Sequence, residues 1–132
     1  MGMRVRIAGP LLALACAWGA PPAAAQPAPG AAATPDGATL FRRQCMACHS
    51  VNAGDPPRQG PNLAGVFGRK PGSVTGFRYS AGYAAADFVW DEAHLDSYLA
   101  NPQAVIPGSV MAYRQNNPAT RQVIIAWLKE QN

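Results

Sequence analysis

Cys45-Met46-Ala47-Cys48-His49 is the stretch of sequence that decides the fold of this 132-residue chain. Two thiols three residues apart, followed directly by an imidazole, form the C-x-x-C-H pattern of c-type haem attachment. The thiols add across the two porphyrin vinyl groups, and the adjacent imidazole lies under the iron as an axial ligand. The pattern therefore predicts one haem held covalently by Cys45 and Cys48, with His49 on its iron.

Two other uses of these residues stay open at this point. A redox disulfide between Cys45 and Cys48 would favour a βαβ context, and no β-branched runs alternate with helical patterns in this chain. A structural zinc site would need a fourth ligand, and the other histidine, His94, has no cysteine pair beside it. Because His49 directly follows Cys48, a tetrahedral site built from both would also be strained. The haem interpretation is favoured over both alternatives.

Residues 1–25 have the pattern of a secretory signal peptide. Arg4 and Arg6 precede a short apolar run over residues 7–17, and the small residues 23–25 end just before Gln26. The apolar run is too short for a membrane span. We therefore expect export to the periplasm, cleavage before Gln26, and no transmembrane span.

A lipid anchor through Cys16 is the alternative for this segment. Cys16 follows Leu14-Ala15, but Ala13 stands where a larger apolar residue is usual. We therefore do not expect the lipid-anchored form.

The remainder of the chain divides into a linker and one domain. Residues 26–35 (QPAPGAAATP) form an Ala/Pro linker without periodicity, and residues 36–132 form a single small domain. Cleavage would remove two of the eleven basic residues and none of the seven acidic ones, which leaves nine against seven, a net charge of +2. Without a basic stripe we expect no nucleic-acid partner.

The domain pattern predicts an all-α fold with about four helices and long Gly/Pro loops. The predicted helices run from Asp36 to about Cys48, from Ser80 to about Ala86, from Asp91 to Asn101-Pro102, and from Asn117 towards the C-terminus. The fourth has an apolar stripe of Val123, Ile124, Trp127 and Leu128. Residues 51–76 are rich in Gly and Pro, and a loop of that length in a compact domain favours wrapping around a bound group.

The second iron ligand can be found by elimination. After loss of the signal, two methionines remain, Met46 and Met111. Met46 lies between the anchoring cysteines and cannot reach the far face of the iron. His94 points off the apolar stripe of its helix. Met111 lies in a Pro/Gly loop that can turn a thioether inward, so we assign Met111 as the second ligand.

The chain resembles the class I c-type cytochromes, which include mitochondrial cytochrome c and its bacterial periplasmic relatives. The resemblance covers nearly all of residues 36–132. After the haem motif, it rests on Gly60-Pro61-Asn62-Leu63, Val66-Phe67-Gly68-Arg69-Lys70, Gly76-Phe77-Arg78-Tyr79-Ser80, Trp90, Tyr98-Leu99-Ala100-Asn101-Pro102, Ile106-Pro107-Gly108-Ser109-Val110-Met111 and Ala126-Trp127-Leu128.

The resemblance implies a small cytochrome c fold and a role for each matching residue. The Pro61 carbonyl would accept a hydrogen bond from His49, and Tyr98 would lie near Met111 on the distal side. Gly37 and Phe41 of the first helix would meet Trp127 of the last. The groups that would satisfy the haem propionates are Arg69, Tyr79 and Trp90.

The predicted function is that of a soluble one-electron carrier rather than an enzyme, because Met111 closes the coordination position that haem catalysis needs. We expect a monomer with transient redox partners. Family lysines that flank the methionine loop are replaced here by Gln103, Ala104 and Val110. Part of the family's lysine ring can be replaced by arginines, namely Arg42, Arg43, Arg58 and Arg114. We therefore expect weaker electrostatic steering. An electron-relay subunit of a larger oxidoreductase is the alternative, and a haem peroxidase is a more distant one.

Overall fold

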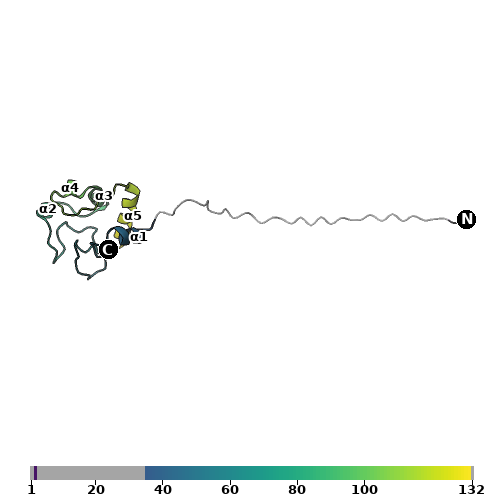
Figure 1. The fold of residues 1–132 in the computed structure, drawn as a ribbon, viewed down its shortest axis with the longest axis horizontal. Coiled ribbons are helices and arrows are strands. Elements are labelled where there is room, and N and C mark those ends of the chain that lie inside the picture. Colours follow the sequence, from purple (N-terminus) through teal and green to yellow (C-terminus); the bar gives the residue numbers. More distant parts are fainter. Residues whose placement is uncertain (1, 3–34, 132) are drawn as a thin grey trace. The chain divides into compact units, whose positions relative to one another are not determined.

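The computed structural model describes Gly2 and residues 35–131, and the domain in it is built from five α-helices (Figure 1). No residue in this described part is in a β-strand, which confirms the all-α prediction. The signal peptide of residues 1–25, with Cys16, and most of the 26–35 linker lie outside the described residues. In chain order the helices are α1 (Gly37–Gln44), α2 (Ala81–Ala84), α3 (Glu92–Ala100), α4 (Pro102–Val105) and α5 (Pro118–Lys129).

Helix α1 begins as predicted but ends earlier. The Asp36 side chain caps it by accepting a hydrogen bond from the Thr39 amide at 2.8 Å. The expected end at Cys48 is wrong, because the backbone leaves the helical region at Cys45 (φ −121°, ψ −36°). From there a turn follows, in which the His49 amide donates to the Cys45 carbonyl at 2.9 Å. The two thiols and the imidazole are therefore presented by a turn rather than by a helix.

Helices α3 and α5 begin at the predicted caps. The Asp91 side chain accepts from the His94 amide at 2.8 Å, and the Asn117 side chain accepts from the amides of Ala119 and Thr120. Pro118 occupies the first turn of α5, where its missing N–H costs nothing. The side-chain hydrogen bonds of these two N-cap residues therefore determine where α3 and α5 begin.

Helix α4 is the element that the sequence pattern did not predict. Asn101-Pro102 was expected only to end α3, yet Asn101 is both the C-cap of α3 and the N-cap of α4, with Pro102 at N1. The extended backbone of Asn101 (φ −156°, ψ 92°) interrupts the helix and changes the direction of the chain. Pro102 then starts α4, because proline fits the first position of a helix. The count is therefore five helices rather than about four.

Helix α2 is shorter than predicted, and its N-cap residue has another role. It ends at Ala84 rather than near Ala86, and the Ser80 hydroxyl makes no capping hydrogen bond. The Ser80 oxygen is instead buried without a hydrogen-bond partner among the described residues.

Helix α5 is central to the packing of the helices, because it contacts both α1 and α3. Helix α1 packs on α5, and α3 packs on both α5 and α4. At the α1–α5 crossing, a Cβ on Gly37 would lie 2.9 Å from the Val123 carbonyl oxygen, so glycine permits the close approach. The Phe41 and Trp127 rings meet there with centroids 4.8 Å apart. In Figure 1, α2 lies well away from α1 and α5, beyond α3 and α4.

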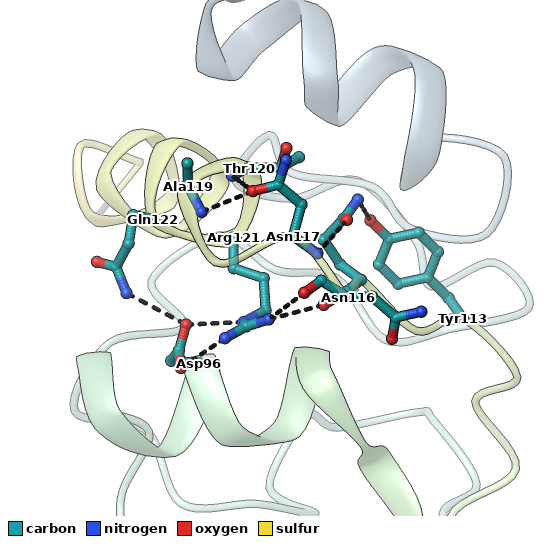
Figure 2. Close-up of polar contacts among 9 residues, drawn as sticks. Asp96, Tyr113, Asn116, Asn117, Ala119, Thr120, Arg121 and Gln122 are labelled. Atoms are coloured by element: carbon teal, nitrogen blue, oxygen red, sulfur yellow. Dashed lines mark hydrogen bonds and ion pairs between the residues drawn. The ribbon is translucent and has the colours of Figure 1, made fainter.

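Arg121 connects α5 by hydrogen bonds to α3 and to the segment that precedes α5 (Figure 2). Its guanidinium donates to both carboxylate oxygens of Asp96, at 2.8 and 3.2 Å, and to the carbonyls of Gln115 and Asn116. The Arg121 side chain is 11% exposed and the Asp96 side chain is 29% exposed, so solvent screens this pair in part. None of the helices in residues 35–131 has the length and apolar character that crossing a membrane requires.

Candidate cofactor site

A cavity of about 330 Å³ lies inside the hydrophobic core of the domain. Several of its walls are core side chains, among them Val66, Leu95, Leu99, Ile124 and Leu128. All nine site residues singled out from the sequence line this one cavity: Cys45, Cys48, His49, Pro61, Arg69, Tyr79, Trp90, Tyr98 and Met111. The core is therefore built around a space that a large apolar group would complete.

The two thiols lie at the wall formed by the turn after α1. Both are free and partly buried. Burial raises the pKa of the Cys45 thiol to about 11, with a smaller contribution from the neighbouring Cys48. Redox-active cysteines have lowered pKa values, so this environment counts against the disulfide alternative. Within residues 35–131, no three His, Cys, Asp or Glu side chains gather as a metal site would require.

The His49 imidazole is held in one tautomer. Its Nδ1 lies 2.8 Å from the Pro61 carbonyl oxygen, and because a carbonyl only accepts, Nδ1 must carry the proton. The Nε2 lone pair is then free to bind a metal. Burial lowers the pKa of His49, opposed in part by the Pro61 hydrogen bond, which favours the neutral ring. A Cβ on Gly60 would lie 2.7 Å from Nε2, so only glycine fits there.

The chain after His49 is fixed by side chains that bond to nearby backbone. The Asn62 amide donates to the carbonyls of Asn52 and Asp55, and its oxygen accepts from the Ala64 amide at 2.7 Å. The Ser50 hydroxyl donates to the Pro56 carbonyl at 2.9 Å. These bonds hold the loop that carries the Pro61 carbonyl.

Met111 lines the cavity from the segment between α4 and α5. Tyr98, on α3, lines the same cavity. His94 does not; its Nδ1 pairs with Asp91 at 2.7 Å and its ring stacks on Phe88. His94 therefore lies outside the group of side chains that line the cavity.

The three residues expected to meet haem propionates lie near one another. The Trp90 amide donates to the Arg69 carbonyl at 2.9 Å, which joins their two segments. Arg69 also donates from Nη1 to the Ala64 carbonyl and from Nη2 to the Asn62 carbonyl. Three further N–H groups of its guanidinium stay available. Burial lowers the pKa of Arg69 and raises the pKa of Tyr79.

Sequence reasoning missed Ser80, Tyr83 and Ser109. Ser80 and Tyr83 line the cavity, and the Ser80 hydroxyl has no hydrogen-bond partner within the described part of the chain. The Ser109 hydroxyl bonds to the hydroxyls of Tyr98 and Tyr83. Because Ser80 directly precedes a helix, the sequence predicted a helix-capping role for its hydroxyl. The hydroxyl makes no capping hydrogen bond, so its place at the cavity could not be predicted in this way.

The residues present fit a haem. The cavity offers two thiols, an imidazole with its free Nε2, a thioether, an apolar enclosure and a buried hydroxyl without a partner, which a carboxylate oxygen could satisfy. These features define a class: a small all-α protein that wraps a covalently attached haem.

The family model for cytochrome c matches residues 35–132. A cytochrome c2 iso-2 of Magnetospirillum fulvum is 49% identical over 86 residues, which is 64% of this chain and 88% of the relative. A cytochrome c of Kluyveromyces lactis is 47% identical over 77 residues, 58% of this chain and 70% of the relative. A cytochrome c of Ulva intestinalis is 42% identical over 95 residues, 71% and 86% of the two chains.

The chain therefore belongs to the cytochrome c family. It carries a haem attached covalently through Cys45 and Cys48, and it is a class I c-type cytochrome. It transfers electrons between redox partners and is not an enzyme.

Proposed function

We propose that this cytochrome is a freely diffusing periplasmic carrier, and that His49 and Met111 would be the two protein ligands of its haem iron. The observation that supports it is the gathering of two thiols, a tautomer-fixed imidazole and a thioether around one cavity. Bound haem supplies a one-electron couple between Fe(III) and Fe(II). The protein supplies the ligands, the burial and the partner surface.

Each ligand has a distinct task in this proposal. The Pro61 carbonyl keeps the proton on Nδ1 of His49 and makes Nε2 a better donor. The Met111 thioether is a soft ligand that favours the reduced state, and burial disfavours the extra charge of the oxidised state. Both raise the potential. With both positions filled, no site stays open for a substrate.

The haem propionates need donors where they are buried. We assign this task to the Ser80 hydroxyl, the Tyr79 hydroxyl, the Trp90 indole and the remaining guanidinium N–H groups of Arg69. The Ser80 oxygen supports the assignment because it is buried at the cavity and no group in residues 35–131 bonds to it.

The absorption spectrum of the ferric protein tests the ligand assignment. Thioether ligation gives a charge-transfer band at the red end of the spectrum, and Met111→Ala should abolish it. Met46→Ala is the matched control, since Met46 is 42% exposed and its loss should leave the band intact. A band that survives Met111→Ala would overturn the assignment.

The proposed export rests on residues 1–25, with 26–35 as a linker and 36–132 as the haem domain. Mass spectrometry of the haem protein from a periplasmic fraction should give a mature chain that begins at Gln26. A lipid-modified Cys16, or a chain that keeps residues 1–25 in the cytoplasm, would contradict the proposal.

We infer that the surface around Met111 makes a transient contact between a monomer and its partners, and that charge steers this contact only weakly. Val110 is 82% exposed, and the lysines of the described domain are Lys70 and Lys129. We expect an interface under about 1,200 Å² in total. Ferricyanide oxidation of the reduced protein should slow only modestly as salt is raised. The variant Ala104→Lys/Val110→Lys should restore a steep slope. A steep slope in the unmodified protein would refute this surface.

The exposed apolar side chains and the scarcity of lysines favour one second candidate, a relay subunit held permanently in an oxidoreductase. Val110 and Met46 are both large exposed apolar side chains. Size exclusion of a native periplasmic extract separates the two: a species of about 12 kDa, from about 107 residues plus haem, supports the free carrier, and a haem peak at high mass supports the subunit.

A further inference from the structure

Three hydroxyl groups from three different elements meet in a closed triangle. Tyr83 comes from α2, Tyr98 from α3, and Ser109 lies two residues before Met111. The Tyr83 and Tyr98 oxygens are 2.5 Å apart, Tyr98 and Ser109 are 2.8 Å apart, and Tyr83 and Ser109 are 3.0 Å apart. Every pair is within hydrogen-bond distance.

A triangle of hydroxyls can satisfy itself. Each hydroxyl has one proton to donate and lone pairs to accept, so each can donate to the next around the ring. Two members of the ring are buried, with Ser109 1% exposed and Tyr98 6% exposed, and Tyr83 is partly buried. Burial is also the main cause that raises the pKa of Tyr98, so its proton stays in place at neutral pH. Removal of one oxygen would leave a buried proton without an acceptor.

Tyr83 reaches this position because α2 lies directly on the segment before Met111. A Cβ on Gly82 would lie 3.1 Å from both the Pro107 carbonyl carbon and the Ile106 side chain. Glycine at position 82 thus permits a close backbone approach. The Tyr83 ring also packs on Tyr79, with centroids 5.0 Å apart.

Ser109 is the last firmly held residue before Met111. Its amide donates to the Ile106 carbonyl at 3.0 Å, and the Gln103 side chain bonds to its carbonyl and to the Gly108 amide. Val110 is 82% exposed. In the described part of the chain, the next inter-segment backbone hydrogen bond comes at Gln115, to Leu99. The position of Met111 therefore depends strongly on the position of Ser109.

We propose that Tyr83 is a positioning residue for the Met111 ligand. Its hydroxyl completes the triangle with Tyr98 and Ser109, and the triangle holds the residue 106–109 turn so that the thioether stays on the iron. Tyr83 acts through Ser109 and not on the iron itself. This inference rests on the ligation proposed above.

Imidazole is a suitable probe, because it takes the second position on ferric iron only when the thioether leaves. At fixed neutral pH, Tyr83→Phe should tighten the apparent imidazole affinity of the whole haem protein about three- to tenfold, the effect of one lost buried hydrogen bond. Ser109→Ala should tighten the imidazole affinity to a similar degree. It serves as a second variant because it removes a different hydroxyl from the same ring. Ser73→Ala removes an exposed hydroxyl bonded to the Lys70 carbonyl and should leave the affinity unchanged.

Two further readouts separate positioning from general loss of stability. In Tyr83→Phe, amide hydrogen exchange should speed up at Ser109 and not at Leu63, whose amide bonds to the Ser50 carbonyl. A Tyr83→Phe/Tyr98→Phe cycle should be strongly non-additive, since both side chains belong to one ring. Additive effects, or an imidazole affinity within twofold of the unmodified protein, would overturn this proposal alone. A missing thioether band in the unmodified protein would overturn the ligation and this proposal together.

Discussion

The segments on the two sides of the haem cavity are held in different ways. The proximal segment, residues 49–69, is tied by side chains to backbone groups close in sequence: Asn62 to Asn52 and Asp55, and Arg69 to Ala64. The distal segment, residues 106–117, has local bonds as well, but its side chains also bond to residues that are remote in sequence. Its partners include Tyr83, Tyr98 and Gln44, which lies 69 residues from Tyr113.

This difference indicates two kinds of stability. The proximal loop can form most of its bonds as soon as its own chain folds, because the loops that they close are short. The distal segment needs α1, α2 and α3 in place before its partners exist. We therefore expect the distal segment to open more easily than the proximal one, in line with the variation of local stability across a domain. The four predictions that follow test this contrast.

The largest effect is expected on the proximal side, from Gly60→Ala. A Cβ there would lie 2.5 Å from Nδ1 and 2.7 Å from Nε2 of His49, so the imidazole must move. Urea unfolding of the haem protein should show a loss of about 3 kcal/mol or more, with a changed haem spectrum.

Gly54→Ala is the matched control for that variant. Gly54 has φ +85° but open space around its Cα, so the cost should be about 1–2 kcal/mol, from backbone conformation alone. If Gly60→Ala and Gly54→Ala lost equal unfolding free energy, the contact of the new Cβ with His49 would not contribute to the loss of stability.

The next effect is expected from Asn62→Ala in the same loop. Asn62 is 8% exposed, and its side chain satisfies two carbonyls and one amide. The loss should be about 2–3 kcal/mol in urea unfolding, because buried polar groups would stay unpaired. Asn52→Ala removes one exposed side-chain bond to Asp55 and should cost less than about 0.5 kcal/mol. Comparable losses would show that the proximal loop does not depend on its buried amide.

Much of the fold could be predicted from local signals. Asp36, Asp91 and Asn117 cap their helices as the sequence suggested. The early end of α1 and the existence of α4 could not be predicted, because they depend on backbone angles at Cys45 and Asn101 that no side-chain pattern fixes. Proline at position 102 is compatible with either a helix end or a helix start.

The candidate site also contains residues that the sequence could predict and residues that it could not. The haem motif and Pro61 are close in sequence, and the His49–Pro61 hydrogen bond lies where the family resemblance placed it. Tyr83 was missed because its partners, Tyr98 and Ser109, are 15 and 26 residues away. Only the packing of α2 on the distal segment brings these hydroxyls together. The ligand and propionate assignments stay predictions.

A smaller effect is expected on the distal side, from Gln44→Ala. The Gln44 side-chain oxygen accepts from the Tyr113 hydroxyl and from the Gln115 amide group, which joins the end of α1 to the distal segment. Its loss should destabilise that segment by about 1 kcal/mol. Hydrogen exchange at the Gln115 amide should then accelerate, while exchange at Leu63 in the proximal segment should not change.

Gln44→Glu is the control for the distal variant, because a carboxylate keeps the acceptor for both donors. It should leave exchange at Gln115 close to that of the unmodified protein. Faster exchange at Leu63 and Gln115 alike in Gln44→Ala would show that the two segments open together, and the contrast between them would be wrong.

The smallest effect is expected from Asp96→Asn, on α3, because Asp96 acts on the end of the distal segment only through Arg121. Asp96 accepts from Arg121, which also holds the carbonyls of Gln115 and Asn116 (Figure 2). The hydrogen bond from Arg121 is the main cause that lowers the pKa of the Asp96 carboxyl below its usual 3.8. Asp96 is 29% exposed, so at neutral pH the variant should lose about 0.5–1 kcal/mol.

The effect of Asp96→Asn on stability should depend on pH, and the lowered pKa of Asp96 determines the direction of that dependence. A carboxyl whose folded pKa is lowered stabilises the fold above its unfolded pKa and loses that contribution as the pH falls through the folded value. The gap in unfolding free energy between the unmodified protein and Asp96→Asn should thus be constant above about pH 5 and close at lower pH. Asp87→Asn, at an exposed carboxylate, should show no such gap. A gap that persists unchanged in acid would mean that the Asp96 side chain acts through its shape and not its charge. In that case the distal segment would depend on neutral hydrogen bonds along its whole length, as it does at Gln44 and Ser109.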